Sequence, residues 1–382
     1  MATADESGWG AGTMSATVLE VLHLSEAADR SKWEQLVSQS PLSDIYYRPA
    51  YVLANQIAGQ GEGICLVIGI GGKTILFPLM LRPISLPLAW EQGLMDAVTP
   101  YGYGGLLTLS PQETFEAVDL RSAISAFRAW CFESQIVSVL LRLHPVREQP
   151  KWIAACGDGG VTLRMHGPTT AIDVQKWDDT GRRPMEMRSR RRTYLNSARR
   201  KLHTTCVTGI EVRSPSATVD HIAIFQNIYE QTMDRLKSQS YYYFPRAYYE
   251  AMATGLADKM AVITAWHGDQ AVGSAMIFSD DQLGHYHLGG ATEEGRDLRA
   301  STLVLTEGAA WARDKGCSLM HLGGGAAGDD SLYHFKRSFG GPEFAYAFCT
   351  CITNADAYKS LVDQNTASEQ PLRVGFFPEY RA

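Results

Sequence analysis

No stretch of the chain approaches the roughly 20 consecutive apolar residues that a helix needs to cross a bilayer. The longest apolar-rich runs have the length of strands, at residues 64–70, 75–81 and 136–141. The first segment, MATADESGWGAGTMSATV, lacks the basic and apolar regions of a secretion signal. We therefore predict no membrane span, a cytoplasmic location and a flexible leader over residues 1–15.

Metal-binding spacing is also missing, because the seven cysteines include no CxxC pair. Cys349 and Cys351 lie two apart in a strand-like run, where they would share one face and pack. An odd number of cysteines without a disulfide framework is typical of a reducing compartment. We expect structural cysteines and no metal.

Basic residues are scarce overall but dense in one segment. The chain has 35 Lys and Arg against 41 Asp and Glu, a net charge of −6, which argues against a generally basic nucleic-acid-binding protein. Between residues 182 and 201, however, Glu186 is the only acidic residue. The basic residues there are Arg182, Arg183, Arg188, Arg190, Arg191, Arg192, Arg199, Arg200 and Lys201. A solvated helix face usually alternates signs, so this segment indicates a site for a phosphate-rich ligand.

The order of apolar patterns predicts an α/β (α+β) fold in two halves. A length of 382 residues with 45% hydrophobic content allows two domains. In the first half we expect strands at 64–70 and 74–81 around a Gly71-Gly72 turn, a helix at 113–133, a strand at 137–143 and a connection over 147–170. In the second half we expect helices at 184–203, 219–237 and 300–315, with strands at 209–213, 260–266, 270–279, 282–288 and 319–322.

A strand meander, a crossover helix and a further strand are the elements of the GNAT acyltransferase fold. Two halves of similar order predict two such domains in tandem. We place the N-terminal domain at residues 1–170 and the C-terminal, catalytic domain at residues 171–351.

A glycine-rich turn and a lysine between two phenylalanines stand out in the second half, in the segment HLGGGAAGDDSLYHFKRSFGG. Glycines at a strand end let backbone approach a ligand closely. Lys336, held between Phe335 and Phe339, could be a partly desolvated cation that stabilises an oxyanion. The alternative is an amphipathic helix with both phenylalanines on its core side.

One arginine of the basic segment lies on an apolar helix face. Helical spacing puts Arg191 in line with Met187, Leu195 and Leu202, whereas Arg188, Arg192 and Arg199 point elsewhere. An arginine on a buried stripe needs an anionic partner. That partner is either a ligand phosphate or an acid such as Asp173 or Asp234.

Six short pieces follow one another between Thr99 and Lys336. They are 99–105 (TPYGYGG), 142–145 (RLHP), Arg191 with Ala198, Tyr229 with Thr232, 285–290 (HYHLGG), and 322–325 (LGGG) with 335–336 (FK). In this order they resemble the Fem family, the tandem-GNAT transferases that move an aminoacyl group from aminoacyl-tRNA to an amine. The resemblance also implies that the tail, residues 352–382, folds back onto the first domain.

The resemblance implies roles for individual residues. Lys336 matches the lysine that stabilises the tetrahedral oxyanion, next to Phe335, and Tyr286 matches a strand tyrosine that faces the reacting groups. Arg191 would lie near a ligand phosphate. The predicted substrate- or tRNA-binding residues are Arg188, Arg191, Arg192, Arg199, Arg200, Tyr103, Tyr229, Gly323 and Gly324. The aminoacyl-tRNA would be a co-substrate, with no further cofactor.

The sequence does not identify the general base or fix the roles of the nearby histidines and aromatic residues. By strand alternation, His285 and His287 face away from Tyr286. An aminoacyl ester is already activated, so no Ser-His-Asp or Cys-His set is needed. The base could be Asp329, His334 or a substrate phosphate. The aromatic residues Tyr241 to Phe244, Tyr248 and Tyr249 could stack on the terminal adenine or lie in the core.

Two other functions compete with this interpretation. A GNAT enzyme that uses acyl-CoA generally has glycines before the helix at 300, where backbone amides hold the pyrophosphate. Here Arg299 takes the glycine position. The other alternative is a binding or scaffold protein without catalytic activity. In such a protein the Phe335-Lys336 motif would have no chemical role.

The acceptor of the predicted transfer is an amine. Relatives that modify a peptidoglycan precursor grip its diphosphate with a lysine shortly after an aromatic residue like Tyr51, and residues 52–56 (VLANQ) contain none. A coiled-coil insertion is also missing. We therefore expect a small or peptidic acceptor, as in antibiotic biosynthesis, with a peptidoglycan precursor as the alternative, and a monomeric protein.

Overall fold

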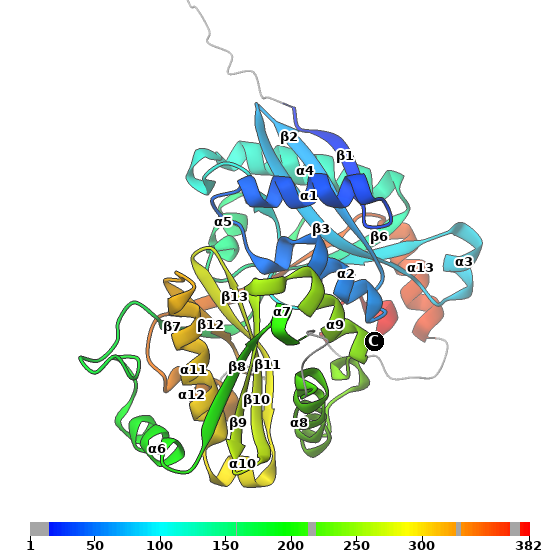
Figure 1. Cartoon of the computed structure of the whole chain (residues 1–382). Helices are drawn as coiled ribbons and strands as arrows, with labels where there is room; N and C mark the ends of the chain where they lie inside the picture. Colours follow the sequence, from blue (N-terminus) through cyan, green and yellow to red (C-terminus); the bar gives the residue numbers. More distant parts are fainter. Residues whose placement is uncertain (1–14, 158, 213–218, 326–329, 367–374) are drawn as a thin grey trace, which may run out of the picture.

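One mixed β-sheet runs through the whole molecule in the computed structural model, which describes residues 15–157, 159–212, 219–325, 330–366 and 375–382 (Figure 1). Its strand order is β1-β2-β3-β4-β6-β13-β7-β12-β11-β10-β9-β8, with β5 beside β3. The strands of the first half are β1 (Thr17–His23), β2 (Glu62–Ile70), β3 (Lys73–Pro83), β4 (Met95–Val98), β5 (Leu107–Thr108) and β6 (Ile136–Arg142). The others are β7 (Thr162–Asp173), β8 (His203–Thr208), β9 (Met260–His267), β10 (Gln270–Asp280), β11 (Leu283–Ala291), β12 (Leu319–Gly323) and β13 (Glu343–Ile352).

The two halves repeat one topology. Strands β1 to β4 form an antiparallel meander, and β6 then pairs parallel to β4 after a helical crossover. Strands β8 to β11 form a second antiparallel meander, and β12 pairs parallel to β11 in the same way. This repeat confirms the predicted α/β fold of two similar units.

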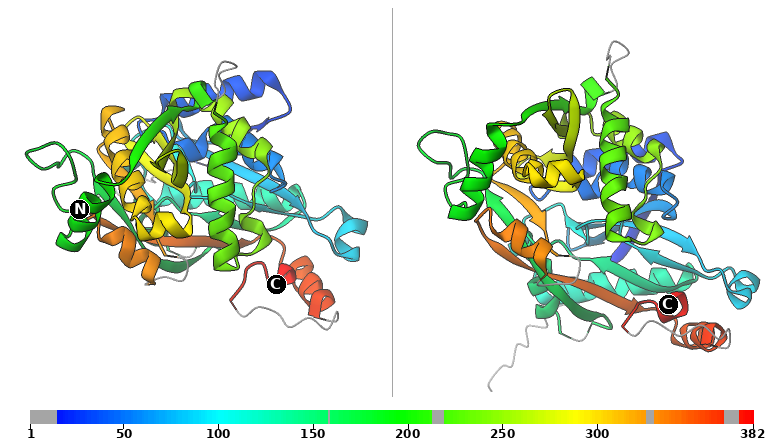
Figure 2. Two further views of the ribbon diagram at one scale, coloured as in Figure 1. Left: turned by 60° about the horizontal axis from the view of Figure 1, so that its bottom comes forward. Right: turned by 90° about the horizontal axis from the view of Figure 1, so that it is seen from below.

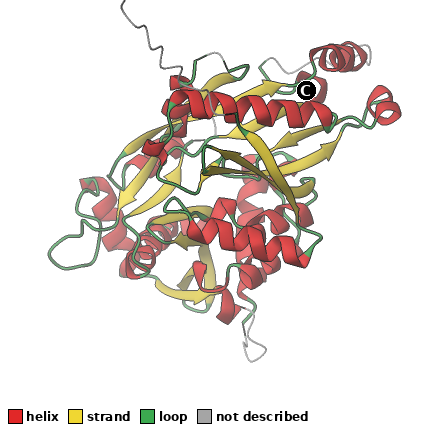
Figure 3. Cartoon of the chain, turned by 90° about the horizontal axis from the view of Figure 1, so that it is seen from above, coloured by secondary structure: helices red, strands yellow, loops and turns green. Residues whose placement is uncertain are grey.

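Helices flank the strands of both halves (Figure 3). In the first half α4 (Ala117–Glu133) packs on one face, and α1 (Ala27–Gln39) and α2 (Pro49–Ile57) pack on the other. In the second half α11 (Ala300–Asp314) and α6 (Ser189–Arg199) share one core, and α8 (His221–Leu236) and α9 (Arg246–Gly255) share another. The remaining helices are α3 (Pro87–Gln92), α5 (Gln149–Ala155), α7 (Gly209–Val212), α10 (Glu293–Asp297), α12 (Ser331–Arg337) and α13 (Ala355–Thr366). None of the described helices is long and apolar enough to cross a membrane.

The halves meet through two long strands and a shared core. Strand β13 pairs with β6 on one side and with β7 on the other, and β7 also pairs with β12. The core around α8 and α9 includes Ile45, Tyr46 and Tyr51 from the first half. Beside it, the buried guanidinium of Arg48 forms an ion pair with the fully buried carboxylate of Asp280 on β10. The expected connection at 147–170 leads from the first half to the second, and it contains α5 and most of β7, which the sequence did not predict.

Two further local predictions are corrected. The expected helix at 184–203 extends only over α6, and the expected strand at 209–213 is the short helix α7, with strand β8 before it. Threonine and valine favour the strand in residues 203–208. Gly209 packs so closely on backbone that an added Cβ would lie 2.5 Å from the carbonyl oxygen of Ala257. The Gly71-Gly72 hairpin is confirmed, since Ile70 pairs with Lys73 and both glycines have positive φ.

The C-terminal tail packs against the first half, where α13 lies beside β6 (Figure 2). Leu361 and Tyr358 of α13 share a core cluster with Ile84 and Val137. Tyr380 adds a 2.7 Å hydrogen bond between its hydroxyl and that of Ser138. The tail therefore contributes to the stability of this half.

Shortening Leu361, whose side chain is fully buried, tests this contribution. We expect Leu361→Ala to lower the free energy of unfolding by about 2–4 kcal/mol, because it leaves a cavity. Lys359→Ala on the same helix is the control, since Lys359 is exposed and should change stability by less than about 0.5 kcal/mol. Urea denaturation measures both, and equal midpoints would contradict the packing of α13.

Candidate active site

A glycine turn at the end of β12 brings groups from both halves together. Gly323 has a φ of 76°, a conformation that favours glycine. An added Cβ would lie 2.5 Å from the hydroxyl oxygen of Tyr103 and 3.4 Å from Nζ of Lys336. Strands β11 and β12 pair only as far as His285 and His321. Glycine is thus required for Tyr103 and Lys336 to approach the same turn.

Lys336 is a buried cation with one backbone partner. It lies on α12 with 8% of its surface exposed, and its Nζ donates a 2.8 Å hydrogen bond to the carbonyl oxygen of Gly324. Its Nζ also lies 5.6 Å from the ring centroid of Tyr286. Burial lowers the pKa of Lys336 to about 8, and the charge of Asp330 partly opposes this shift. A fixed ammonium with donors to spare can stabilise an oxyanion.

Tyr286 reaches this site from an irregular part of β11. The pairing with β10 jumps from Leu288 to Tyr286, so His287 forms a bulge. The imidazole of His287 hydrogen-bonds the hydroxyl of Tyr248 at 2.8 Å and His285 lies against Asp44, whereas Tyr286 packs on the core of α6 and α11, so both histidines face away from Tyr286 as alternation predicts. Burial raises the pKa of Tyr286 to about 12, which keeps its hydroxyl neutral.

Arg191 is half-buried beside neutral partners. Its Nε donates to the hydroxyl of Ser338 and its Nη1 to that of Thr302, each at 2.8 Å, and its guanidinium lies 4.4 Å from the ring centroid of Phe335. Burial lowers the pKa of Arg191 to about 10, and Arg190 and Arg299 add to this shift.

The internal partners considered for Arg191 are engaged elsewhere. Asp173 pairs with Lys176, and Asp234 accepts a hydrogen bond from Tyr243. Within the described parts of the chain, no carboxylate forms an ion pair with Arg191. The guanidinium thus keeps capacity for an external anion.

Arg191 opens into a pocket of about 730 Å³ at the N-terminal end of α11. None of the described residues that line the pocket is acidic. They are Arg188, Arg190, Arg191, Tyr194, Arg296, Arg299, Ser301, Thr302, Ser331, His334, Phe335 and Ser338. Five arginines and a helix N-terminus make this pocket strongly positive.

The other residues of the predicted basic set lie off the pocket. Arg192, Arg199 and Arg200 do not line it. Arg199 instead forms a 2.9 Å ion pair with Glu307 on α11. The sequence missed Arg296 as a lining residue; it lies on α10, just before Arg299 and the start of α11.

The predicted aromatic contacts divide between core and surface. Tyr229 is 2% exposed and stacks on Phe225. Phe244, Tyr248 and Tyr249 are buried in the same core. Tyr241 and Tyr242 are exposed, and Tyr241 lies 6.0 Å from Tyr101 between ring centroids. Of the suggested bases, His334 lines the arginine pocket and Asp329 lies outside the described residues.

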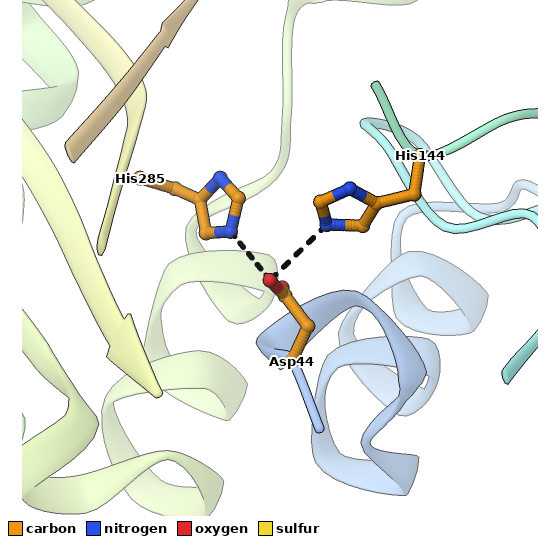
Figure 4. Close-up of side chains that lie close together, drawn as sticks. All are labelled: Asp44, His144 and His285. Atoms are coloured by element: carbon orange, nitrogen blue, oxygen red, sulfur yellow. Dashed lines mark hydrogen bonds and ion pairs between the residues drawn. The ribbon is translucent and has the colours of Figure 1, made fainter. Parts of the chain in front are cut away.

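Asp44, His144 and His285 form a buried cluster whose side chains point toward one another (Figure 4). The Oδ2 atom of Asp44 lies 3.2 Å from Nε2 of His144 and 2.8 Å from Nε2 of His285. Burial alone would raise the pKa of Asp44, but the charge of His285 and the hydrogen bonds of both histidines hold it far below its usual range. No spacing in the sequence connects these three positions, so only the fold reveals the cluster.

The low pKa of Lys336 makes stability depend on pH. The unfolded lysine keeps its proton up to about pH 10.4, whereas the folded one loses it near pH 8. Between these values the unfolded state binds more protons, so the wild type should gain up to about 1.4 kcal/mol of stability for each pH unit. Lys336→Met should remove this rise and the exposed Lys201→Met should keep it, as measured by urea denaturation from pH 7 to 10. An unchanged pH dependence in Lys336→Met would refute the buried ammonium.

Comparison with known proteins agrees with this architecture. Residues 189–337 match the acetyltransferase (GNAT) domain family. No protein of curated function matches the sequence. The crystal structure of FemX superposes with a TM-score of 0.63 and 12% identity, covering 90% of this chain and 99% of that one.

Two further solved structures share the fold. The C-terminal domain of a protein from Agrobacterium fabrum, named for lysylphosphatidylglycerol synthetase, gives a TM-score of 0.54 at 11% identity and covers 87% of this chain and 96% of that one. L-PGS from Bacillus licheniformis gives 0.53 at 9% identity, covering 89% and 97%. Residues 189–337 are therefore similar to the acetyltransferase (GNAT) domain family, and the chain as a whole has the fold of the FemX crystal structure.

Proposed function

We propose that this protein transfers an aminoacyl group from aminoacyl-tRNA to the amine of a small or peptidic acceptor and forms an amide bond. The observation that carries the proposal is the arginine pocket, which shares helix α12 with the buried ammonium of Lys336. The pocket would hold the phosphates of the RNA end, and the ammonium would act on the ester carbonyl. Aminoacyl-tRNA is the co-substrate, and no other cofactor is invoked.

The arginine pocket suits phosphates of a nucleic acid. A planar guanidinium group can donate two parallel hydrogen bonds to the oxygens of one phosphate. Its charge also gives affinity for the nucleic-acid backbone that does not depend on the base sequence. Arg299 has a φ of 65°, although a residue with a Cβ pays about 1–2 kcal/mol for this conformation. Its guanidinium lies 4.5 Å from the ring centroid of Tyr194, at the pocket wall. The arginine side chain thus replaces the close backbone cradle that a glycine there would allow.

The reaction needs little beyond alignment and charge stabilisation. When the acceptor amine attacks the ester carbonyl, its oxygen becomes negative and Lys336 can donate a hydrogen bond to it. The hydroxyls of Tyr103 and Tyr286 stay neutral, since burial raises the pKa of each to about 12. They can orient the amine, in keeping with the role that the Fem resemblance implies.

The lysine with which peptidoglycan-modifying relatives hold the diphosphate of their acceptor has no counterpart in residues 52–56 of α2. Tyr51 and Asn55 of α2 are fully buried. The hydroxyl of Tyr51 donates a 2.7 Å hydrogen bond to the carbonyl oxygen of Tyr101. This favours a small or peptidic amine, for example in natural-product biosynthesis, over a diphosphate-linked muropeptide.

Acyl-CoA is the second candidate donor. The match of residues 189–337 to the GNAT acetyltransferase domain favours it. Coenzyme A also carries phosphates, which arginines would bind.

A transfer assay separates the two donors. Bulk tRNA charged with radiolabelled amino acids and labelled acetyl-CoA are each offered with a pool of amines and peptides, with and without RNase. We expect label to move from tRNA to an amine and the transfer to stop after RNase treatment. Transfer from acetyl-CoA alone would replace the proposal with the second candidate.

Lys336→Ala tests the proposed oxyanion contact. We expect turnover to fall about a hundredfold or more, because one preorganised donor to the transition state is lost. Binding of tRNA should change little, as Lys336 does not line the arginine pocket. Lys201→Ala, on the surface, is the control, and unchanged turnover in Lys336→Ala would remove this lysine from the mechanism.

Neutralising the arginine pocket tests the donor site. Arg188→Gln and Arg299→Gln should each weaken tRNA binding and reduce the slope of log affinity against log salt by about 0.7–0.9. Arg199→Gln is a matched control, because Arg199 is paired with Glu307 outside the pocket. Filter binding at several salt concentrations measures the slopes. Equal slopes in all variants would mean that the pocket holds something other than RNA.

A further inference from the structure

Arg142, the last residue of β6, is a half-buried cation that has no part in the proposed donor site. Its Nη1 donates a 2.8 Å hydrogen bond to the carbonyl oxygen of Thr99. Among the residues that the structure describes, no carboxylate forms an ion pair with Arg142. A guanidinium has five N–H donors, and taking its charge partly out of water is costly without an anion. Arg142 therefore keeps capacity for an anionic ligand.

The strand register places Arg142 beside aromatic side chains that lead to the proposed reaction site. Arg142 pairs with Phe348 on β13, and directly paired residues of neighbouring strands share one face of the sheet. The ring centroid of Tyr346 lies 5.3 Å from that of Phe348 and 5.0 Å from that of Tyr103. The hydroxyl of Tyr103 lies at the glycine turn, close to Nζ of Lys336.

Two exposed tyrosines, Tyr241 and Tyr242, lie near the same group of rings. Burial first, and then Tyr103, raise the pKa of Tyr346 far above its usual value, whereas the charge of Arg142 opposes this rise. Tyr241 and Tyr242 also act on the pKa of Tyr346, in the same direction as burial. Such effects are strongest between near neighbours, so Arg142 and both exposed tyrosines lie close to Tyr346. Arg142 is the one charged side chain in this set, which therefore favours an anion and is open to solvent at Tyr241 and Tyr242.

The Arg142 set and the arginine pocket are separate sites that lead to the same lysine. Phe335 lines the arginine pocket, whereas its neighbour Lys336 bonds the carbonyl oxygen of Gly324 at the glycine turn. Neither Arg142 nor any tyrosine of its set is among the described residues that line the arginine pocket. A transfer between two substrates needs two such sites, one for the donor and one for the acceptor.

We propose that Arg142 binds a carboxylate of the acceptor, which is therefore an amino acid or a short peptide with a free carboxylate besides its amine. The inference rests on the proposed acyl transfer and names a group that the acceptor must carry. One planar guanidinium can donate two parallel hydrogen bonds to one carboxylate. The tyrosine rings suit the organic part of the acceptor, because ligand sites are mostly apolar and aromatic with a few placed polar groups. Arg142 thus holds one end of the acceptor while the amine at the other end reaches the ester near Lys336.

Blocking the carboxylates of the acceptor tests this inference in the wild type. The pool of amines and peptides is offered to the enzyme untreated, as methyl esters, and after alkaline hydrolysis of the esters, with all three matched for primary amine. We expect the rate at low acceptor concentration to fall at least tenfold with the esters, because the charge-assisted hydrogen bonds are lost. The rate should recover after hydrolysis. Equal rates with the untreated and esterified pools would overturn the inference.

Arg142→Gln tests whether this side chain is the anchor. We expect the apparent KM for the untreated pool to rise at least tenfold, with little change in kcat or in the KM for the donor. The rate with the esterified pool should stay the same, so the preference for free carboxylates disappears. A purely structural defect would lower both rates by one factor and keep the preference, and that result would contradict the role of Arg142.

Arg121→Gln is the matched control for this variant. Arg121 lies on α4 and also donates to a backbone carbonyl, that of Cys156 at 3.1 Å. It should keep the wild-type preference for free carboxylates. If Arg142→Gln fails to fold, the comparison of free and esterified pools in the wild type decides alone.

The same assay separates this inference from the proposed function. If label moves from acetyl-CoA and not from tRNA, the proposed donor fails, and the pools are compared with acetyl-CoA as the donor. Transfer from tRNA at equal rates to free and esterified acceptors overturns the carboxylate anchor and leaves the function standing. A wild type that is inactive with both donors overturns both.

Discussion

The pairing of β13 with both β6 and β7 is the constraint on which the rest of the structure depends. Two rows of backbone hydrogen bonds turn two separate meanders into one sheet, and a slip of one residue in either row would turn every side chain of β13 to the wrong face. The same strand fixes the distance between the halves. Tyr103 comes from the first half and Lys336 from the second, so the proposed reaction site exists only when that sheet is complete.

Buried charges between the halves add specificity to this arrangement. Arg48 and Asp280 form an ion pair with almost no exposure, and Asp44 and His285 form a hydrogen bond where neither is exposed. Such pairs add little net stability compared with apolar packing, but separating them leaves a charge unpaired at a cost of about 3–5 kcal/mol. They therefore penalise any other placement of one half on the other.

Part of the fold could be predicted from the sequence, since apolar periodicity indicated the β2–β3 hairpin of the first unit, the strands β9 to β11 of the second, and the crossover helix of each. The strand expected at 209–213 was wrong because the close approach of Gly209 to the backbone of α9 is a tertiary constraint. The glycine turn, Lys336 and the half-buried Arg191 were identified from local motifs. Residue spacing could not show that Arg199 turns to Glu307, because that depends on how α6 packs on α11. Nor could it bring together Asp44, His144 and His285, which lie on three distant segments.

The central place of β13 has a consequence for how the chain is made. Phe348 pairs with Arg142, about 200 residues earlier in the chain. During synthesis the outer edge of β6 has no partner strand until nearly the whole protein has emerged, and an unpaired edge invites wrong pairing between nascent chains. A late strand thus ties the assembly of the first unit to the completion of the second, and a chain truncated before β13 would have neither a continuous sheet nor a complete site.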